Sequence, residues 1–428
     1  MKFESLRGFR DIYPEDAEPR DRMLSEIKKV ARSFGYQIID FPSVEPLDLY
    51  RIKSGEELVS QTFSFTDKGG REVTLIPEAT PSVVRMLTSK KDLPKPVRWF
   101  SLPKIWRYEE PQSGRLREHV QFNADIFGLD TPEADAEIVG LACTILDSLG
   151  LAGNYEIRIN HRKLMDEILR ALGVVDIPRV FGIIDRFRKI DRQEFMNSLG
   201  EAGVSQDSAR IIEKLASSRV KADDSAGLIQ SLMEMNNDLR ESLERVVSTI
   251  RMISYYTSSE IVMDFSTVRG LSYYTGLVFE AFDIRGELRA ILGGGRYNGL
   301  SSLISDQDIP AIGFGMGDVV LELLLKRTNL WHKDISGNRY YVCTVSDDAA
   351  SFSLKLSIDL RKKGADVIRD MGKRSLSAQL RSASVNGCSY AIILGTKEVS
   401  TGSITIRNMS DGRQEAISIE EFLSSIKK

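Results

Sequence analysis

The fold is indicated first by the stretch from Arg98 to Gly128, which reads RWFSLPKIWRYEEPQSGRLREHVQFNADIFG. Runs rich in β-branched and aromatic residues lie at both ends, and Gln112, Ser113 and Gly114 mark a turn between them. We therefore predict a strand, a long polar turn and a second strand. Few helical segments separate these runs from similar ones nearby, which favours antiparallel pairing over crossover connections.

The same strand-like pattern extends outward from Gln37 to Phe127 and returns after residue 259. A polar arm and a helix precede it, and apolar residues at helical spacing predict a second helix over 138–149. The runs YYTGLVFEAF and LRAIL lie on either side of a short turn, which predicts a hairpin. Residues 161–255 are rich in charged residues with apolar stripes and show no strand pattern. We predict that they form a helical insertion that interrupts one antiparallel sheet.

A different pattern follows the polar linker HKDISGN, because strand-like and helix-like runs now alternate. This alternation predicts a compact α/β unit with a mostly parallel sheet. Residues 337–428 contain 14 basic and 10 acidic residues, a net charge of +4, so the remainder carries −7 of the total of −3. A basic unit on an acidic body suits an RNA partner, although chance variation explains the number equally well.

Composition excludes several classes of protein. Hydrophobic residues make up 42% of the chain and charged residues 28%, as in soluble globular proteins. No apolar run is long enough to span a bilayer, and the N-terminus does not resemble a secretory signal. The three cysteines and three histidines are not at metal-ligand spacing, so we predict a cytoplasmic protein without a structural metal.

Two common nucleotide-binding motifs are absent from the sequence. It contains neither the P-loop pattern nor a dinucleotide-binding glycine pattern between a strand and a helix. The run LGGGRY (Leu292–Tyr297) is rich in glycine, but tight turns produce such runs more often than phosphate-binding loops do.

Clusters of arginine and acidic residues are the other candidates for chemistry. Arg107, Glu109, Arg115 and Arg117 lie around the turn of the 98–128 stretch. An arginine on an open antiparallel sheet can bind an α-phosphate through two parallel hydrogen bonds. From composition alone, however, a surface ion-pair ladder is the favoured interpretation, and such a ladder contributes little stability.

Two further strings allow more than one interpretation. VRGLSYYTG (Val268–Gly276) holds Arg269 before paired tyrosines, which suits a phosphate-binding cation and a polar pocket, or else a turn with aromatic core residues. Glu78, in PEATP, suits a grip on a substrate ammonium group. It equally suits the first turn of a helix, where the helix dipole favours an acid.

Taken together, these strings resemble the histidyl-tRNA synthetases, a family of class II aminoacyl-tRNA synthetases. The 98–128 stretch is similar to class II motif 2, IPAIGFGMGDVVLELLL (Ile309–Leu325) to motif 3, and VRGLSYYTGLVFE to the histidine-specific signature. GFRDIYPED resembles the family's opening arm, LGGGRYNGL its glycine-rich segment, and the C-terminal unit its anticodon-binding domain. The resemblance covers nearly the whole chain in the right order.

The resemblance implies an α+β fold with a class II antiparallel sheet core and flanking helices in residues 1–159 and 259–331. A helical insertion domain would occupy 160–258, and an α/β anticodon-binding domain 337–428. It also implies a homodimer that joins L-histidine to tRNA(His) through a histidyl-adenylate. ATP would enter with Mg²⁺, and neither a protein-ligated metal nor a membrane would be involved.

The family's functional residues can be assigned where this sequence matches. Arg107 and Arg269 would be the catalytic cations, and ATP would contact Arg107, Glu109, Arg115 and Arg269. The expected histidine-binding residues are Glu78, Ala79, Thr80, Arg107, Gln121, Asp125, Arg269, Tyr273 and Tyr274.

The sequence departs from the family at three positions. Val320 stands where motif 3 normally has an arginine, so either Arg115 or Arg296 substitutes or ATP binds more weakly. Asp125 replaces a usual Glu, and Ser272 a common acid. The missing arginine keeps open an alternative function as the histidine-sensing regulatory subunit of ATP phosphoribosyltransferase. A generic RNA-binding scaffold ranks behind both, because it needs no dense set of Arg, Glu and Tyr.

Overall fold

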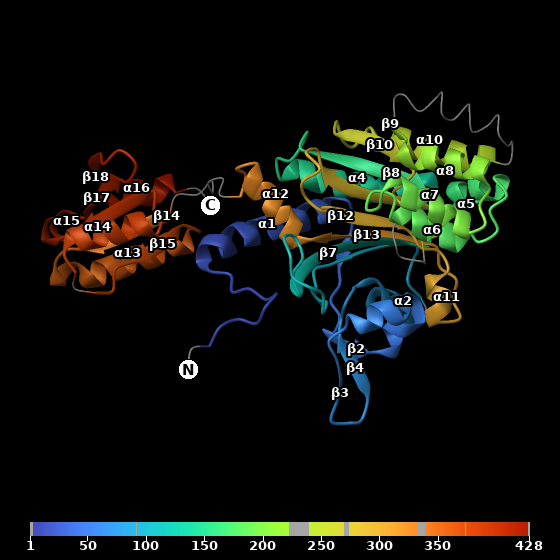
Figure 1. Ribbon diagram of the computed structural model, residues 1–428. Coiled ribbons are helices and arrows are strands. Elements are labelled where there is room, and N and C mark those ends of the chain that lie inside the picture. The colour runs from blue at the N-terminus through green and yellow to red at the C-terminus, as the bar shows by residue number, and fades with distance from the viewer. Residues whose placement is uncertain are drawn as a thin grey trace. The chain divides into compact units, whose positions relative to one another are not determined.

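The computed structural model describes residues 3–90, 92–221, 239–268, 274–331, 339–372 and 374–426, with the backbone alone at 53–58. The chain forms two compact units, Met1–His332 and Lys333–Lys428 (Figure 1). Within the described ranges, no helix combines the length and the apolar character needed to cross a bilayer.

The first unit is built on a sheet that has ten strands in the described part of the chain. Its path is β1 (Gln37–Ile38), β5 (Val97–Ser101), β7 (Glu118–Phe127), β13 (Ala311–Gly317), β12 (Leu292–Arg296), β11 (Leu277–Asp283), β8 (Tyr155–His161), β10 (Glu260–Asp264) and β9 (Arg219–Lys221), with β6 (Lys104–Trp106) beside β7. Antiparallel pairing is confirmed from β5 to β8, whereas β1–β5 and β8–β10 are parallel pairs. The predicted strand, turn and strand of residues 98–128 are confirmed.

The glycine-rich run is a strand and not a turn. The hairpin of β11 and β12 is confirmed, but its second strand begins only at Leu292 and continues through the glycines, all buried. A Cβ at Gly294 would lie 2.3 Å from the carbonyl oxygen of Gly313, and a Cβ at Gly295 2.5 Å from that of Leu277. Glycine is therefore required because the neighbouring backbones approach too closely for any side chain.

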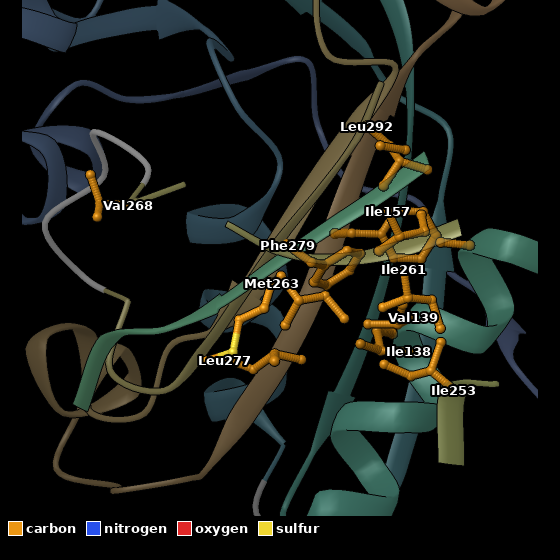
Figure 2. Close-up of a cluster of buried hydrophobic side chains, with 14 of the residues drawn as sticks. Ile138, Val139, Ile157, Ile253, Ile261, Met263, Val268, Leu277, Phe279 and Leu292 are labelled. Carbon is orange, nitrogen blue, oxygen red and sulfur yellow. The ribbon is translucent and has the colours of Figure 1, made fainter. Parts of the chain in front are cut away.

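Helices cover both faces of this sheet. On one face lie α1 (Pro14–Ser33), α4 (Pro132–Ser148) and α10 (Arg240–Ile253); on the other lie α2 (Asp48–Ser60), α3 (Thr80–Ser89), α11 (Leu300–Ile304) and the small sheet β2 (Val44–Pro46), β4 (Glu72–Leu75) and β3 (Ser64–Thr66) (Figure 1). Figure 2 shows Ile138 and Val139 of α4 packed with Ile157 and Phe279 of the sheet. The helix α2 was not predicted, and a helix at α3 was only one of the two interpretations of Glu78, because α3 is short and its Val and Thr residues favour strands when the sequence is considered alone.

The charged segment after β8 contains α5 (Arg162–Ala171), α6 (Ile177–Asp185), α7 (Arg192–Glu201), α8 (Gln206–Ser217) and α10. Among its described residues the predicted helical character is confirmed apart from β9, which pairs with β10, and residues 222–238 lie outside the described ranges. A strand of three residues is too short to show a period, and its partner lies about 40 residues further along the chain. Since β8 and β11 pair directly, the segment does interrupt one sheet. The exact division of this unit into core and insertion stays a prediction.

The first unit ends with α12 (Asp318–Arg327), which follows β13 directly.

The second unit contains the sheet β15 (Asp366–Arg369), β14 (Arg339–Thr344), β16 (Tyr390–Leu394), β17 (Ser403–Asn408) and β18 (Gln414–Ser418), with α13 (Ala350–Lys362), α14 (Leu376–Val385), α15 (Thr396–Thr401) and α16 (Ile419–Ser425). The prediction of a mostly parallel sheet is only half correct. β14 pairs in parallel with β15 and β16, but β17 pairs antiparallel with β16 and β18. The strand β18 was not predicted, because the residues QEAIS are largely exposed and show no apolar alternation.

Candidate active site

The candidate site begins with the alternation of side chains along β7. Phe122 and Ile126 are buried in the core beneath α4. Because successive residues of a strand point to opposite faces, Gln121, Asn123 and Asp125 form a polar row on the other face. The row is bound together by a hydrogen bond of 2.7 Å from Gln121 Nε2 to Asn123 Oδ1.

Glycines on the neighbouring strand leave space above this polar row. Gly313 and Gly315 of β13 lie opposite Asp125 and Asn123. A Cβ at Gly313 would lie 2.0 Å from Asp125 Oδ1, and one at Gly315 2.7 Å from Gln121 Nε2. A cavity of about 150 Å³ occupies the space that these glycines leave, and we call it the inner cavity.

The inner cavity brings together six of the nine residues expected to bind histidine. These are Glu78, Thr80, Arg107, Gln121, Asp125 and Tyr274. Ala79 is buried beside them at the start of α3 but is not among the lining residues. Arg269 and Tyr273 lie outside the described residues. The binding roles of all nine residues stay predictions.

Two polar lining residues, Asn123 and Tyr297, were missed, beside the apolar Gly293, Gly313, Phe314 and Gly315. The Tyr297 hydroxyl, which is buried, donates a hydrogen bond to Asp125 Oδ1. Asn123 could have been found from the two-residue period that joins Gln121 to Asp125. Tyr297 offered a weaker signal, namely its position directly after the glycine-rich run.

A larger cleft of about 480 Å³ adjoins the inner cavity, and we call it the outer cleft. The two share Arg107, Gln121, Gly293 and Gly315 as lining residues. Arg107 Nε donates to the Pro77 carbonyl at 2.9 Å, which fixes the guanidinium beside both spaces.

Charges in the outer cleft are partly paired. Arg115 Nη1 lies 2.6 Å from Glu109 Oε2, while Arg107 Nη1 is 4.0 Å from Glu109 Oε1. Burial lowers the pKa of His119, which also lines the cleft, and the positive charge of Arg107 lowers it further. His119 is therefore neutral at pH 7, and the arginines set the sign of the local charge.

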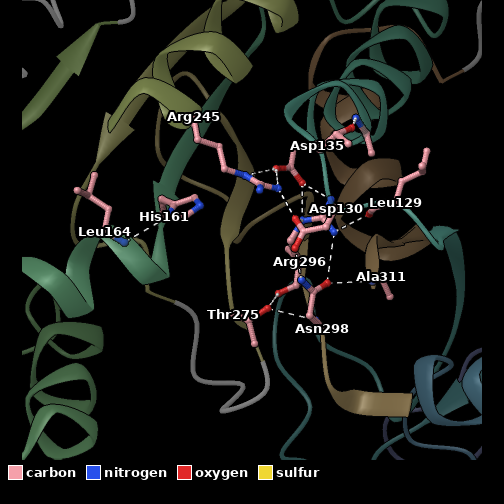
Figure 3. Close-up of polar contacts among 12 residues, drawn as sticks. Leu129, Asp130, Asp135, His161, Leu164, Arg245, Thr275, Arg296, Asn298 and Ala311 are labelled. Atoms are coloured by element: carbon pink, nitrogen blue, oxygen red, sulfur yellow. Dashed lines mark hydrogen bonds and ion pairs between the residues drawn. The ribbon is translucent and has the colours of Figure 1, made fainter. Parts of the chain in front are cut away.

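The structure excludes one of the two candidates for the missing motif 3 arginine. Arg296 is 2% exposed, and its Nε donates to Asp135 Oδ1 at 2.8 Å (Figure 3). It lines a different cavity, together with His161 and Arg245. Arg296 is the last residue of the buried strand β12, and the sequence does not reveal which face of the sheet receives its side chain. Arg115 does line the outer cleft, as does Val320.

The residue that begins α12 connects the opening arm to the site. The Asp318 carboxylate is almost fully buried and accepts hydrogen bonds from Arg20 Nε at 2.8 Å and from the Val120 backbone N–H at 3.0 Å. Arg10, in the GFRDIYPED arm, donates to the same carboxylate at 3.3 Å. These contacts fix the start of α12 against β7, directly behind the polar row.

Among the residues that the structure describes, no group of three or more His, Cys, Asp or Glu side chains could hold a metal ion.

A family model described as Histidyl-tRNA synthetase matches residues 8–318. The chain belongs to the histidyl-tRNA synthetase family. A second model, described as Anticodon binding domain, matches residues 339–428. The family predicted from the sequence motifs is thereby confirmed.

Individual members of the histidyl-tRNA synthetase family agree over the full length. A protein named Histidine–tRNA ligase from Picrophilus torridus is 51% identical over 426 residues, covering 100% of both chains. A histidyl-tRNA synthetase structure from Nostoc sp. PCC 7120 matches with a TM-score of 0.87 at 22% identity, over 100% of this chain and 99% of that one. This likeness confirms the predicted fold class.

One structural neighbour bears on the alternative function. A Bacillus halodurans C protein described as an ATP phosphoribosyltransferase regulatory subunit/histidyl-tRNA synthetase has a TM-score of 0.75. It is 21% identical and covers 89% of this chain and 97% of its own, so the likeness concerns the fold alone.

Proposed function

We propose that this protein attaches L-histidine to tRNA(His) in two steps driven by ATP. In the first step, the histidine carboxylate attacks the α-phosphate of ATP, which forms histidyl-adenylate and releases pyrophosphate. In the second, the histidyl group passes to the 3′-terminal adenosine of the tRNA and AMP leaves. The observation that carries the proposal is the junction at Arg107 of a cavity of amino-acid size with a cleft of nucleotide size.

Selection of histidine is assigned to the buried polar groups of the inner cavity. Asp125, held by Tyr297, would accept a hydrogen bond from the imidazole, and Tyr274 would contact the ring from β11's side. An amino acid without ring nitrogens would leave these groups unpaired, which costs about 1–3 kcal/mol for each group. Such a site discriminates without a separate editing domain.

The ammonium and carboxylate of histidine need opposite charges. Glu78, which is 6% exposed, would pair with the ammonium, supported by Thr80 and Gln121. Arg107, at the junction of the two spaces, would contact both the carboxylate and the α-phosphate. These contacts orient the nucleophile toward the phosphorus atom before the reaction begins.

Charge stabilisation is the main catalytic task, because two anions meet and negative charge builds on phosphate oxygens. Preorganised arginines lower such a barrier, and loss of one comparable donor typically costs roughly 3–4 kcal/mol. Arg107 would act from the junction of the two spaces, and Arg269, which lies outside the described residues, would be the second catalytic cation. Glu109 would contact the adenine, and Arg115 the outer phosphates, within the outer cleft.

Mg²⁺ would arrive with ATP, where it neutralises part of the phosphate charge. The described lining of the outer cleft includes two carboxylates, Glu109 and Glu280, and Glu109 already lies 2.6 Å from Arg115, so the protein residues suit an ion held mainly by ATP. The second unit would hold the anticodon of the tRNA, as its match to the anticodon-binding model suggests. A homodimer in the cytoplasm completes the proposal.

The regulatory-subunit alternative has less support. The full-length relative at 51% identity is named a ligase, and the C-terminal unit matches an anticodon-binding model. Charging of a tRNA(His) transcript with radioactive histidine, beside the other 19 amino acids, separates the two functions. We expect ATP-dependent charging with histidine alone. Histidine binding without charging would instead favour a sensor.

A further inference from the structure

We infer that Arg289 binds the outer phosphates of ATP, a role that rests on the proposed histidine-activating function. Arg289 lies in the connection between β11 and β12, three residues before Leu292. It is exposed and lines the outer cleft, on the strand pair that also supplies Gly293 to both spaces.

The outer cleft carries an excess of positive charge in its described lining. Its cations outnumber its carboxylates, since the lining includes Arg107, Arg115, Lys189, Arg289, Glu109 and Glu280. His119 adds no charge at pH 7, because burial lowers its pKa. This balance favours a polyanionic ligand over a neutral or cationic one.

Among the described residues that line the outer cleft, Arg289 is the cation without a carboxylate partner. Arg115 lies 2.6 Å from Glu109, and Lys189 Nζ lies 3.4 Å from Asp185 Oδ2. Within the part of the chain that the structure describes, the Arg289 guanidinium has no hydrogen-bond or ion-pair partner. A guanidinium beside a cleft, with its donors unused, can bind phosphate oxygens without first breaking an internal ion pair.

Packing around Gly114 locates the Arg289 side chain. A Cβ built on Gly114 would lie 3.3 Å from Val320 Cγ2 and 3.8 Å from Arg289 Cδ. The aliphatic stem of Arg289 therefore passes close to the turn that carries Arg115 and to the apolar Val320. Two arginines thus reach the same part of the cleft from different segments of the chain.

The position of the reaction decides which phosphates Arg289 can contact. The α-phosphate has to lie at Arg107, where the outer cleft meets the inner cavity. Cations beside Gly114 are then available to the β- and γ-phosphates, which leave as pyrophosphate. Arg289 and Arg115 would bind this leaving group together.

Calorimetric titration of the full chain with ATP and with AMP, both without histidine, tests the inference. Arg289→Ala should weaken ATP binding by roughly ten- to a hundredfold, the usual cost of losing a charge-assisted hydrogen bond. AMP, which lacks the outer phosphates, should bind the variant and the wild type equally. Arg289→Lys should fall between them, because lysine keeps the charge but not the paired donors.

A matched control is available on the same connection. Arg285 is also exposed, but it lines a separate cavity with Asp283 and Leu330, so Arg285→Ala should leave ATP binding unchanged.

Unchanged ATP binding by Arg289→Ala, or an equal loss for ATP and AMP, would overturn the inference. A wild-type protein that binds ATP but performs no histidine-dependent chemistry would remove the proposed function while leaving this binding comparison valid. Failure of the wild type to bind ATP would overturn both.

Discussion

At the scale of single residues, the proposed histidine pocket depends on a buried carboxylate and on the hydroxyl that holds it. Asp125 is 4% exposed, and Tyr297 is its hydrogen-bond donor from β12's end of the sheet. The Tyr297 ring also packs against Phe127, with ring centroids 6.5 Å apart. The hydroxyl and the ring therefore have separable roles.

Tyr297→Phe removes the hydroxyl and keeps the ring. We expect the KM for histidine to rise roughly ten- to a hundredfold, the cost of a lost hydrogen bond to a charged group, with the KM for ATP unchanged. Pyrophosphate exchange at varied histidine and ATP concentrations measures both. An unchanged KM for histidine would show that the Tyr297–Asp125 contact does not serve substrate binding.

Gly313→Ala tests the space above the polar row. The new Cβ would meet Asp125 Oδ1 at 2.0 Å, so the carboxylate has to move and histidine binding should fall by at least about tenfold. Gly182→Ala in α6 is the control, because no neighbouring atom lies within 4 Å of its added Cβ. Calorimetric titration with histidine compares the two variants, and equal affinities would contradict the assignment of the inner cavity.

At this scale, the site residues that belong to a motif could be predicted from the sequence. Those that only the fold brings together could not. Glu78, Arg107 and Asp125 belong to recognisable strings, and the structure brings them to one cavity. The contact from Tyr297 to Asp125 spans 172 positions of the chain. Local periodicity in the sequence cannot predict a contact between residues so far apart. Only the register of β12, β13 and β7 brings Tyr297 to Asp125.

At the scale of elements, a buried ion pair joins α4 to the sheet. Asp135 of α4 and Arg296 of β12 are 1% and 2% exposed, and Arg245 of α10 lies 3.0 Å from the other Asp135 oxygen (Figure 3). Removal of Asp135 leaves Asp130, 3.4 Å from Arg296 Nε, as the remaining acidic partner, and breaking a buried pair typically costs roughly 3–5 kcal/mol.

Asp135→Asn should therefore lower the free energy of unfolding of the first unit by about that amount. Urea unfolding followed by circular dichroism measures the loss. Glu133→Gln, at an exposed position on the same helix, should change stability by less than about 0.5 kcal/mol. A loss no larger in Asp135→Asn than in this control would show that the pair does not hold α4 on the sheet.

The start of α5 provides a prediction about pH. Burial lowers the pKa of His161 to about 3, and its Nδ1 accepts a hydrogen bond from the Leu164 backbone N–H at 3.2 Å. The unfolded chain, with a histidine pKa of about 6.5, binds more protons than the folded chain between these values. Stability due to this group is therefore complete above pH 6.5 and falls as the pH decreases toward 3.

His161→Asn keeps an acceptor at the helix start and removes the titrating group. Relative to this variant, the wild type should lose about 2 kcal/mol of unfolding free energy between pH 7.5 and pH 5. Urea unfolding of both proteins at several pH values measures the difference. Parallel pH profiles would contradict a neutral, buried His161.

Among the elements, long periodic segments were predictable and short or glycine-rich ones were not. The helix α1 shows its buried stripe in the sequence, with Met23, Ile27 and Val30 at helical spacing. The strand β12 carries three glycines, which are disfavoured in strands, and the close approach of β11 and β13 explains them. Similarly, the residues of β9 form a strand because they pair with β10.

At the scale of the whole molecule, motif order predicted the fold class, whereas strand order required the structure. The charged segment after β8 returns the chain to β10, which lies parallel beside β8 at residues Ile157 and Ile261. Nothing in either strand specifies this register. The large sheet places the polar row of β7 beside the glycines of β13. Arg107 lies where the inner cavity meets the outer cleft.

Histidine and ATP are proposed to meet at Arg107, and histidine-dependent exchange of pyrophosphate into ATP measures the reaction that this meeting permits. The wild type should exchange with histidine, and Arg107→Ala should reduce the rate by roughly 100- to 1,000-fold. Arg98→Ala is the matched control, since Arg98 pairs with Glu137 at 2.6 Å and lines neither space, so its rate should stay close to the wild-type value. No exchange by a wild-type protein that still binds histidine and ATP, or full exchange by Arg107→Ala, would contradict the account.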